Sequence, residues 1–174
     1  YEEIRNVLIK KGHQFLTHSD TEVILHSWRE WGDKAIEQWH GMFAIVLYDE
    51  RSNEIICIRD RAGVKPFFYY WKDDLFIFGS ELKALIAHPQ FKKEIEPDAV
   101  ASYLQYGYVS HPYCIFRYTN KLKPGHYLRL KLNAKDINVY QYWNVYTYYN
   151  KPKLKIDLQE SIVQTESILQ KAFQ

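Results

Sequence analysis

Cysteine is scarce in this sequence, where Cys57 and Cys114 are the only two among 174 residues. Two cysteines form neither a disulfide framework nor a zinc site, and their scarcity favours a reducing compartment and a cytoplasmic protein. The seven histidines are scattered and lack the spacing of metal ligands. We therefore expect no metal site in this chain.

Long apolar runs and a strong charge of either sign are absent as well. No apolar run approaches the roughly 20 residues of a membrane-spanning helix, and no signal peptide is visible. The formal net charge is only +2, which gives no electrostatic footprint for nucleic acid or an anionic membrane. We therefore predict that the protein binds neither.

Aromatic residues are abundant, at 17% of the chain, and they concentrate at residues 140–149. Such a run could stack on the bases of a single strand. The basic residues beside it are only Lys151, Lys153 and Lys155. We therefore interpret the run as strand packing.

The chain has the composition and length of one ordinary globular domain, with 47% hydrophobic and 25% charged residues. Apolar periodicity and capping patterns predict helices at residues 1–10, 20–31, 34–39, 80–87, 97–106 and 157–174. Strands are predicted at 14–17, 43–48, 54–59, 67–71, 75–78, 126–132 and 137–143. The four strands between 43 and 78 are apolar on both faces, which indicates sheets covered on both sides by other layers.

Two polar, turn-rich segments interrupt these apolar strands, at residues 59–66 and 78–83. Arg59 and Asp60 follow directly on an apolar strand, and buried charges persist only when they are paired. We therefore predict an internal ion pair between them. Gly63 supplies a turn in the first segment, and Ser80 is predicted to cap the helix that follows the second.

Both segments resemble motifs of the glutaminase domain of the glutamine-hydrolysing asparagine synthetases. The motifs are Arg-Asp-x-x-Gly-x-Lys-Pro at 59–66 and Ser-Glu-x-Lys-Ala-Leu at 80–85. Three further stretches agree with that domain in the same order, at residues 19–25, 41–44 and 121–126. The domain is a class II amidotransferase of the N-terminal-nucleophile type. Five motifs in one order make the resemblance specific.

The resemblance implies an α+β fold of four layers, α-β-β-α, with two antiparallel sheets packed face to face between helices. In this N-terminal-nucleophile hydrolase-like sandwich we expect the N-terminal strands to be missing. Residues 1–149 correspond to the C-terminal two-thirds of the glutaminase domain, 150–156 to a linker, and 157–174 to the first helix of an otherwise absent ATP-dependent synthetase domain. If the chain folds alone, open sheet edges should make it self-associate.

The resemblance also implies the chemistry of the intact enzyme, in which a first-residue cysteine hydrolyses glutamine with its own α-amino group as the base. The ammonia passes to an aspartyl-adenylate made with ATP and Mg, which belong to the absent synthetase domain. The first residue here is Tyr1, which cannot act as that nucleophile. We therefore expect no catalytic residue in this chain and no activity from it alone. Its partners would be glutamine, the missing segments and a second copy of the intact enzyme.

One substrate contact of the family falls on this sequence, because Asp20 matches the aspartate that receives the α-ammonium group of glutamine. A carboxylate at a helix N-terminus suits that role. The alternative is that Asp20 only caps the helix, while Ser19 and Glu22 form a capping box there. The residues expected to support the site are Ser19, Glu22, Arg59, Asp60, Gly63, Ser80 and Glu81. Glu81, with Lys83, could shape the passage between the two active sites.

Two other functions stay open on the sequence. A domain that has lost its nucleophile could serve as a binding or regulatory module. An amidotransferase could also act on a different acceptor, such as a sugar, because the acceptor is chosen by the other domain.

Overall fold

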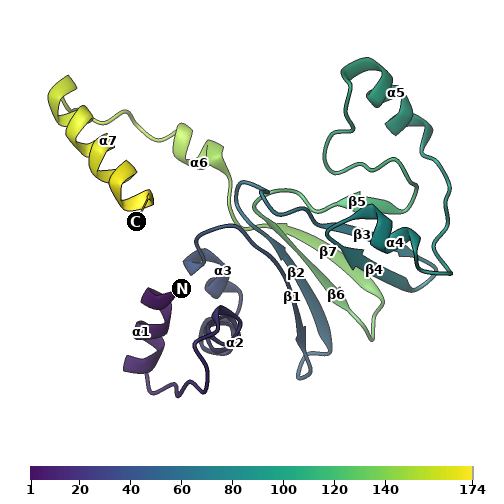
Figure 1. Cartoon of the computed structure of the whole chain (residues 1–174), viewed down its shortest axis with the longest axis horizontal. Helices are drawn as coiled ribbons and strands as arrows, with labels where there is room; N and C mark the ends of the chain where they lie inside the picture. The colour runs from purple at the N-terminus through teal and green to yellow at the C-terminus, as the bar shows by residue number, and fades with distance from the viewer. Residues whose placement is uncertain (174) are drawn as a thin grey trace. The chain divides into compact units, whose positions relative to one another are not determined.

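The computed structural model describes residues 1–173, which divide into two compact units between Asn144 and Val145. The first unit begins with helices α1 (Glu2–Lys10) and α2 (Asp20–Trp31), the 3₁₀ turn η1 (Gly32–Lys34) and α3 (Ala35–Gln38). It continues through β1 (Ala44–Asp49), β2 (Glu54–Arg59), β3 (Phe68–Lys72), β4 (Leu75–Gly79), α4 (Leu82–Ile86), α5 (Pro97–Tyr106), β5 (Thr119–Lys121), β6 (His126–Lys131) and β7 (Asp136–Gln141). The second unit contains α6 (Val145–Tyr149) and α7 (Leu158–Ala172) (Figure 1).

The strands of the first unit form two antiparallel sheets, with the orders β1-β2-β6-β7 and β4-β3-β5. β1 and β2 form the predicted hairpin, with Val46 opposite Cys57. β6 then pairs with β2 from a distant part of the sequence, with Cys57 opposite Leu128. Helices and antiparallel sheets together confirm the predicted α+β class.

The strand β2 lies between two layers, because its successive side chains point to opposite faces. Ile56 and Ile58 pack with Ile36 and Trp39 in a core cluster between the helices and the first sheet. Cys57 faces the other way, into a cluster whose remaining buried members are Phe67, Leu122, Leu128 and Leu130. The apolar strand sequences therefore correctly predicted a sheet covered on both faces.

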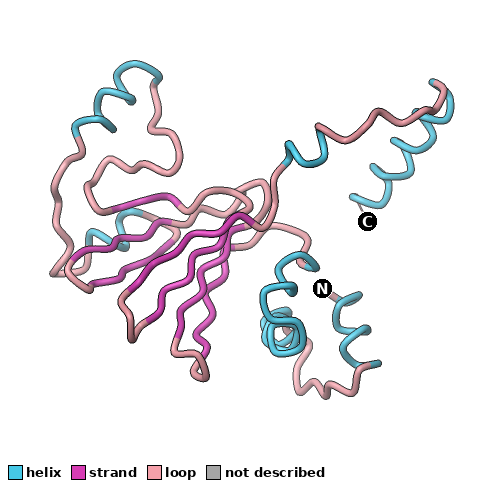
Figure 2. The backbone as a smooth tube through the Cα atoms, turned by 180° about the vertical axis from the view of Figure 1, so that it is seen from behind, coloured by secondary structure: helices cyan, strands magenta, loops and turns pink. Residues whose placement is uncertain are grey.

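A third core cluster joins the second sheet to α4 through Tyr70, Leu85 and Phe91. With the other two clusters it defines four layers: the helices α2 and α3, the first sheet, the second sheet, and α4. The views from front and back show the strands between these helical segments (Figures 1 and 2). The expected layer order α-β-β-α is thus present in the first unit.

Two local predictions are wrong. Residues 14–17 form no strand, and Leu16 is 94% exposed. The prediction failed because these residues bind a side chain of α2, described below, rather than another strand. Ser80 does not cap a helix: α4 begins at Leu82, and Glu81 takes the N-cap position without a side-chain cap. β4 extends to Gly79, so Ser80 still belongs to the turn that leaves the strand.

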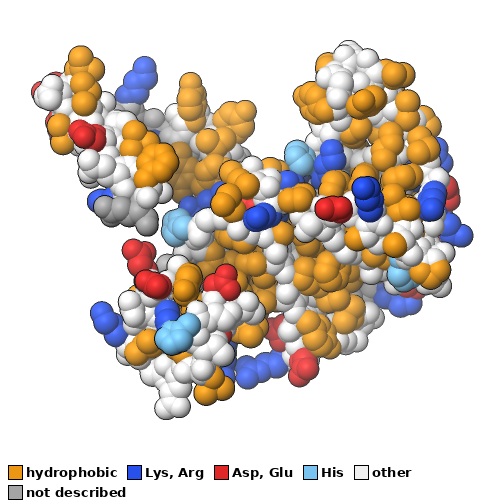
Figure 3. Space-filling view, viewed as in Figure 1, with side chains coloured by type: hydrophobic (Ala, Val, Ile, Leu, Met, Phe, Trp, Pro, Cys, Tyr) orange, Lys and Arg blue, Asp and Glu red, His pale blue; other side chains and the backbone are white. Residues whose placement is uncertain are grey.

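The aromatic run at 140–149 is not one strand. β7 ends at Gln141, and the residues from Val145 to Tyr149 form α6. Elsewhere, aromatic and aliphatic side chains gather on the surface over α5, where Tyr103, Leu104 and Tyr106 are exposed (Figure 3). No helix within residues 1–173 is long and apolar enough to cross a membrane.

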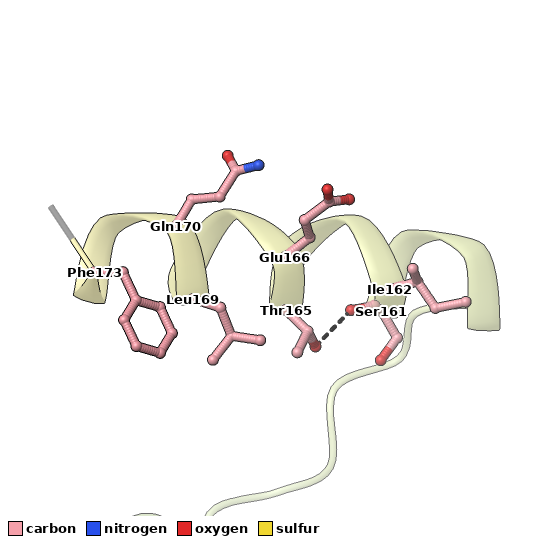
Figure 4. Close-up of a pocket in the computed structure, with 7 residues that line it drawn as sticks. All are labelled: Ser161, Ile162, Thr165, Glu166, Leu169, Gln170 and Phe173. Carbon is pink, nitrogen blue, oxygen red and sulfur yellow. Dashed lines mark hydrogen bonds between the residues drawn. The ribbon is translucent and has the colours of Figure 1, made fainter.

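In the second unit, α7 begins at the N-cap Asp157, whose carboxylate accepts a hydrogen bond of 2.8 Å from the Glu160 amide. Its predicted apolar stripe is present and exposed. Figure 4 shows Ile162, Leu169 and Phe173 along this helix. Thr165 lies on the same helix, and its hydroxyl donates to the Ser161 carbonyl at 2.7 Å. The residues drawn all come from α7 and its C-cap Phe173, so they do not form an enclosed cavity.

Candidate functional site

The N-terminus of α2 carries the predicted substrate contact. Ser19 is the N-cap, with extended backbone angles, and its hydroxyl accepts a hydrogen bond of 3.1 Å from the Thr21 amide. Asp20 is the first residue of the helix, so the alternative that Asp20 is the cap is wrong. Among residues 1–173, its carboxylate has only two long contacts of 3.5 Å, with the hydroxyls of Ser19 and Thr21. The exposed carboxylate therefore remains available to a cationic ligand at the positive end of the helix dipole.

Glu22 does not complete the predicted capping box. Its carboxylate accepts hydrogen bonds of 2.7 Å from the amides of Leu16 and Thr17, and one of 2.6 Å from the Thr17 hydroxyl. The Ser19 amide instead donates to the Thr17 hydroxyl at 3.2 Å. The Thr17 hydroxyl and the Leu16 amide lower the pKa of Glu22 to about 2. Glu22 thus attaches the preceding loop to α2 and holds the turn that presents Asp20.

Asp20 lines a cavity of about 220 Å³ between the N-termini of α1 and α2 and the segment that joins α3 to β1. The lining residues are Tyr1, Glu3, Ile4, Asp20, Val23, Ile24, Gln38, Trp39, His40, Met42, Phe43 and Ile45. Val23 and Trp39 are buried. The Trp39 indole N–H donates to the Ser27 hydroxyl at 3.0 Å, which fixes that ring. The cavity therefore combines apolar side chains with several polar groups, as small-molecule sites commonly do.

Arg59 and Asp60 do not form the predicted ion pair; among residues 1–173 the salt bridges involve neither of them. Arg59 instead donates to the carbonyls of Lys65, Leu122 and Gly63, at 2.8, 2.6 and 2.8 Å. The Asp60 carboxylate accepts from the amides of Val64 and Lys65, at 2.9 and 3.0 Å. Side chains of neighbouring residues in an extended chain point to opposite sides. Arg59 and Asp60 therefore point apart, and each forms hydrogen bonds with different backbone groups. Burial lowers the pKa of Arg59, although the nearby charge of Asp60 opposes that effect.

Gly63 has the turn role that the sequence predicted. Its φ is +67°, and a Cβ there would lie 2.6 Å from Cγ of Pro124. Glycine is therefore required both by the backbone angle and by the close approach.

The turn at residues 59–66, called the corner below, supports the wall of the cavity. The Asp60 amide donates to the carbonyl of Phe43, a lining residue, at 3.0 Å. The Arg61 guanidinium donates to the Glu37 carbonyl at 2.8 Å and contacts His40 at 3.4 Å. The corner is therefore joined to the cavity wall by hydrogen bonds. Ser80 and Glu81, which adjoin the second sheet, are not among the cavity's lining residues.

Sequence reasoning missed His40, Gln38 and Arg61. His40 and Gln38 line the cavity, and Arg61 contacts one of them. Only their positions in the sequence could have pointed to His40 and Arg61. His40 immediately precedes the 41–44 motif, and Arg61 lies inside the 59–66 motif.

Neither cysteine is placed to act as a nucleophile. Cys57 is completely buried, and burial raises the pKa of its thiol to about 12. Cys114 is 3% exposed. Within the part of the chain that the structure describes, no three His, Cys, Asp or Glu side chains cluster as metal ligands do.

The model of the glutamine amidotransferase domain family matches residues 1–143. The chain belongs to this family. It is 39% identical over 145 residues to asparagine synthetase [glutamine-hydrolyzing] 3 of Bacillus subtilis, covering 83% of this chain and 23% of that protein. It is 40% identical over 143 residues to a putative asparagine synthetase [glutamine-hydrolyzing] 2 of Methanocaldococcus jannaschii, covering 79% of this chain and 28% of that protein.

The chain thus spans about a quarter of the length of these curated relatives. A solved structure, the glutamine phosphoribosylpyrophosphate amidotransferase of B. subtilis, has a similar fold. It matches with a TM-score of 0.54 at 17% identity, over 82% of this chain and 26% of that one. The recognised family and the two-sheet amidotransferase fold are therefore both confirmed.

Proposed function

We propose that this chain supplies the glutamine-binding wall of a glutamine-hydrolysing asparagine synthetase. The proposal rests on the carboxylate of Asp20, which lies at the start of α2 and lines the cavity. This carboxylate does not cap the helix, because Ser19 does. The names of the two relatives, both glutamine-hydrolysing asparagine synthetases, support the substrate and the product.

In this proposal Asp20 receives the α-ammonium group of glutamine. A carboxylate selects an ammonium group by charge-assisted hydrogen bonds, which are about twice as strong as neutral ones. Because Ser19 caps the helix and Glu22 holds the loop, the Asp20 carboxylate is positioned before the ligand arrives. Binding therefore costs little reorganisation of the protein.

The complete enzyme would pass ammonia from glutamine to an aspartyl-adenylate made with ATP and Mg. Ammonia must stay unprotonated and away from water until it attacks, which is why two sites in one protein are needed. We place this reaction in the cytoplasm, in agreement with two unpaired cysteines. A dimer of the complete enzyme belongs to the same proposal.

We further propose that residues 1–174 alone do not hydrolyse glutamine. A nucleophile of this family needs a free amine within its own residue. Cys57 and Cys114 are internal and buried. The nucleophile would come from a residue outside this sequence.

The test compares Asp20→Asn with wild type in the natural protein that contains this sequence. Asp98→Asn is the matched control, because Asp98 also lies in the first turn of a helix, α5. Loss of hydrogen bonds to a charged group is expected to lower kcat/KM for glutamine by about 10- to 100-fold. Synthesis from added ammonia should stay unchanged. Equal losses in both variants, or none in Asp20→Asn, would overturn the proposal.

The binding-module alternative makes a different prediction for the natural protein. It should bind glutamine, with an affinity that Asp20→Asn weakens, yet release no ammonia. An amidotransferase for another acceptor would release ammonia without forming asparagine.

A further inference from the structure

Two histidines outside the cavity lining, His13 and His26, contact each other directly, and the proposed function does not use them. His13 lies in the loop 11–19 between α1 and α2, and His26 lies on α2 (Figure 1). Their Nδ1 atoms are 3.0 Å apart, and their rings meet edge to face at 85°. The two side chains are only 14% and 22% exposed. Within residues 1–173 no third metal-ligating side chain joins them, so we interpret the contact as a hydrogen bond.

Each ring also faces a carboxylate through its other nitrogen. Nε2 of His13 lies 2.9 Å from Glu30, whose carboxylate also accepts a hydrogen bond of 2.7 Å from Lys11. Nε2 of His26 lies 3.8 Å from Glu22. The two rings therefore lie in a row between two carboxylates of α2.

This row determines how many protons the two rings carry together. A carboxylate only accepts hydrogen bonds, so each outer nitrogen is satisfied when it carries a proton, and one more proton lies between the two Nδ1 atoms. Two neutral rings carry two N–H protons, so three protons give the pair one positive charge. A fourth proton would place two N–H donors against each other at 3.0 Å, and the rings would have to move apart. Glu22 and Glu30 attract the separate rings and thus favour this separation.

The contact between the rings holds the loop that leads to Asp20. Phe15 packs on the His26 ring with 4.6 Å between their centroids, and the Arg5 guanidinium lies 4.4 Å from the Phe15 centroid. Arg5 also donates to the Thr17 carbonyl at 2.6 Å. Movement of the rings therefore displaces Phe15 and the segment that follows it. The charged groups around the pair are Arg5 on α1, Lys11 at the C-terminus of α1, and Glu22 and Glu30 on α2.

We propose that His13 and His26 are positioning residues that share one proton and hold the loop before α2, so that a second proton weakens the binding of glutamine at Asp20. Histidine is the side chain that changes its charge between about pH 5 and 8, so binding should respond in this range. The open loop takes up the second proton without the clash between two donors, and acid therefore favours the open loop. This inference rests on the proposed function and adds a dependence on pH to the same site.

The first test measures KM for glutamine at about pH 8 and about pH 5.5 in the natural protein. In wild type KM should rise about 3- to 10-fold at the lower pH, the effect of one lost hydrogen bond. His26→Asn places an amide near the position of Nδ1, which accepts from His13 when that ring is charged and donates to it when neutral. Its KM should change by less than about twofold. His26→Phe lacks the contact, so its KM should be raised at both pH values. His18→Asn, at an exposed histidine of the same loop, should match wild type.

Hydrogen exchange gives a second readout that does not depend on activity. The amides of Leu16 and Thr17 donate to Glu22, so their protection, measured by mass spectrometry and corrected for the chemical exchange rate at each pH, reports the state of the loop. Protection should fall at the lower pH in wild type and persist in His26→Asn. The same pH dependence in these two proteins, in protection or in KM, would overturn the inference. If the loop opens in acid but Asp20→Asn leaves KM unchanged, the proposed function fails, and the positioning role fails with it.

Discussion

Three polar residues at the start of α2 have three different roles. Ser19 caps the helix, Asp20 stays available in the cavity, and Glu22 binds the loop before the helix. The sequence predicted the cap because that contact is local. It did not predict the partners of Glu22, because Leu16 and Thr17 reach the carboxylate only after the loop folds back on the helix.

The pKa of Glu22 gives a prediction about acid stability. Because that pKa falls from 4.5 to about 2 on folding, the ionised carboxylate stabilises the fold above pH 4.5 and loses its effect as the pH falls toward 2. Glu22→Gln should lower the urea midpoint at pH 6, and the difference from wild type should shrink at pH 3. Glu50→Gln, in the exposed β1–β2 turn, is the control. A difference that is equally large at both pH values would contradict this account.

Arg59 and Asp60 show a limit of reading charges along a sequence. Two opposite charges side by side suggested an ion pair. Instead each side chain is buried and forms hydrogen bonds with its own set of backbone groups. The number of carbonyls and amides available in a tight turn is a property of the folded chain. Gly63, by contrast, was predictable, because its role depends on the local backbone angle.

At the scale of elements, the apolar strands were the most predictable part of the fold. β1, β2, β3, β4, β6 and β7 all lie where the pattern placed them, within one or two residues. β5 was missed because its residues Thr119–Lys121 are polar, and its pairing with β3 is a long-range contact. The loop at 14–17 has a strand-like composition but no strand beside it.

The burial of β2 predicts that its cysteine is inert. Cys57 is completely buried, and its thiol has a pKa of about 12; Cys114 is buried as well. Since the thiolate is the reactive form, the folded chain of 174 residues should take up no adduct from a thiol reagent at pH 8 within minutes. Intact-mass measurement should show two adducts in urea. A rapid single adduct on the folded chain would mean that one cysteine is reactive, and a nucleophile inside this sequence would have to be reconsidered.

At the scale of the whole molecule, the family and the fold class followed from five motifs in one order. The amidotransferase match over residues 1–143 confirms the family, and the two antiparallel sheets confirm the fold class. The domain limits at 149 and 157 and the expected self-association stay predictions. The cavity itself could not be predicted. It joins α1, α2 and the α3–β1 segment, and a motif does not indicate which elements will meet.

The central claim is that the Asp20 carboxylate recognises the ammonium group of glutamine. The most direct measurement compares glutamine with 4-carbamoylbutanoate, the same molecule without its amino group, as substrates of the natural protein and its Asp20→Asn variant. Wild type should prefer glutamine by about 10- to 100-fold in kcat/KM, the effect expected of hydrogen bonds to a charged group, and Asp20→Asn should lose that preference. A variant that keeps the full preference would show that another group reads the ammonium.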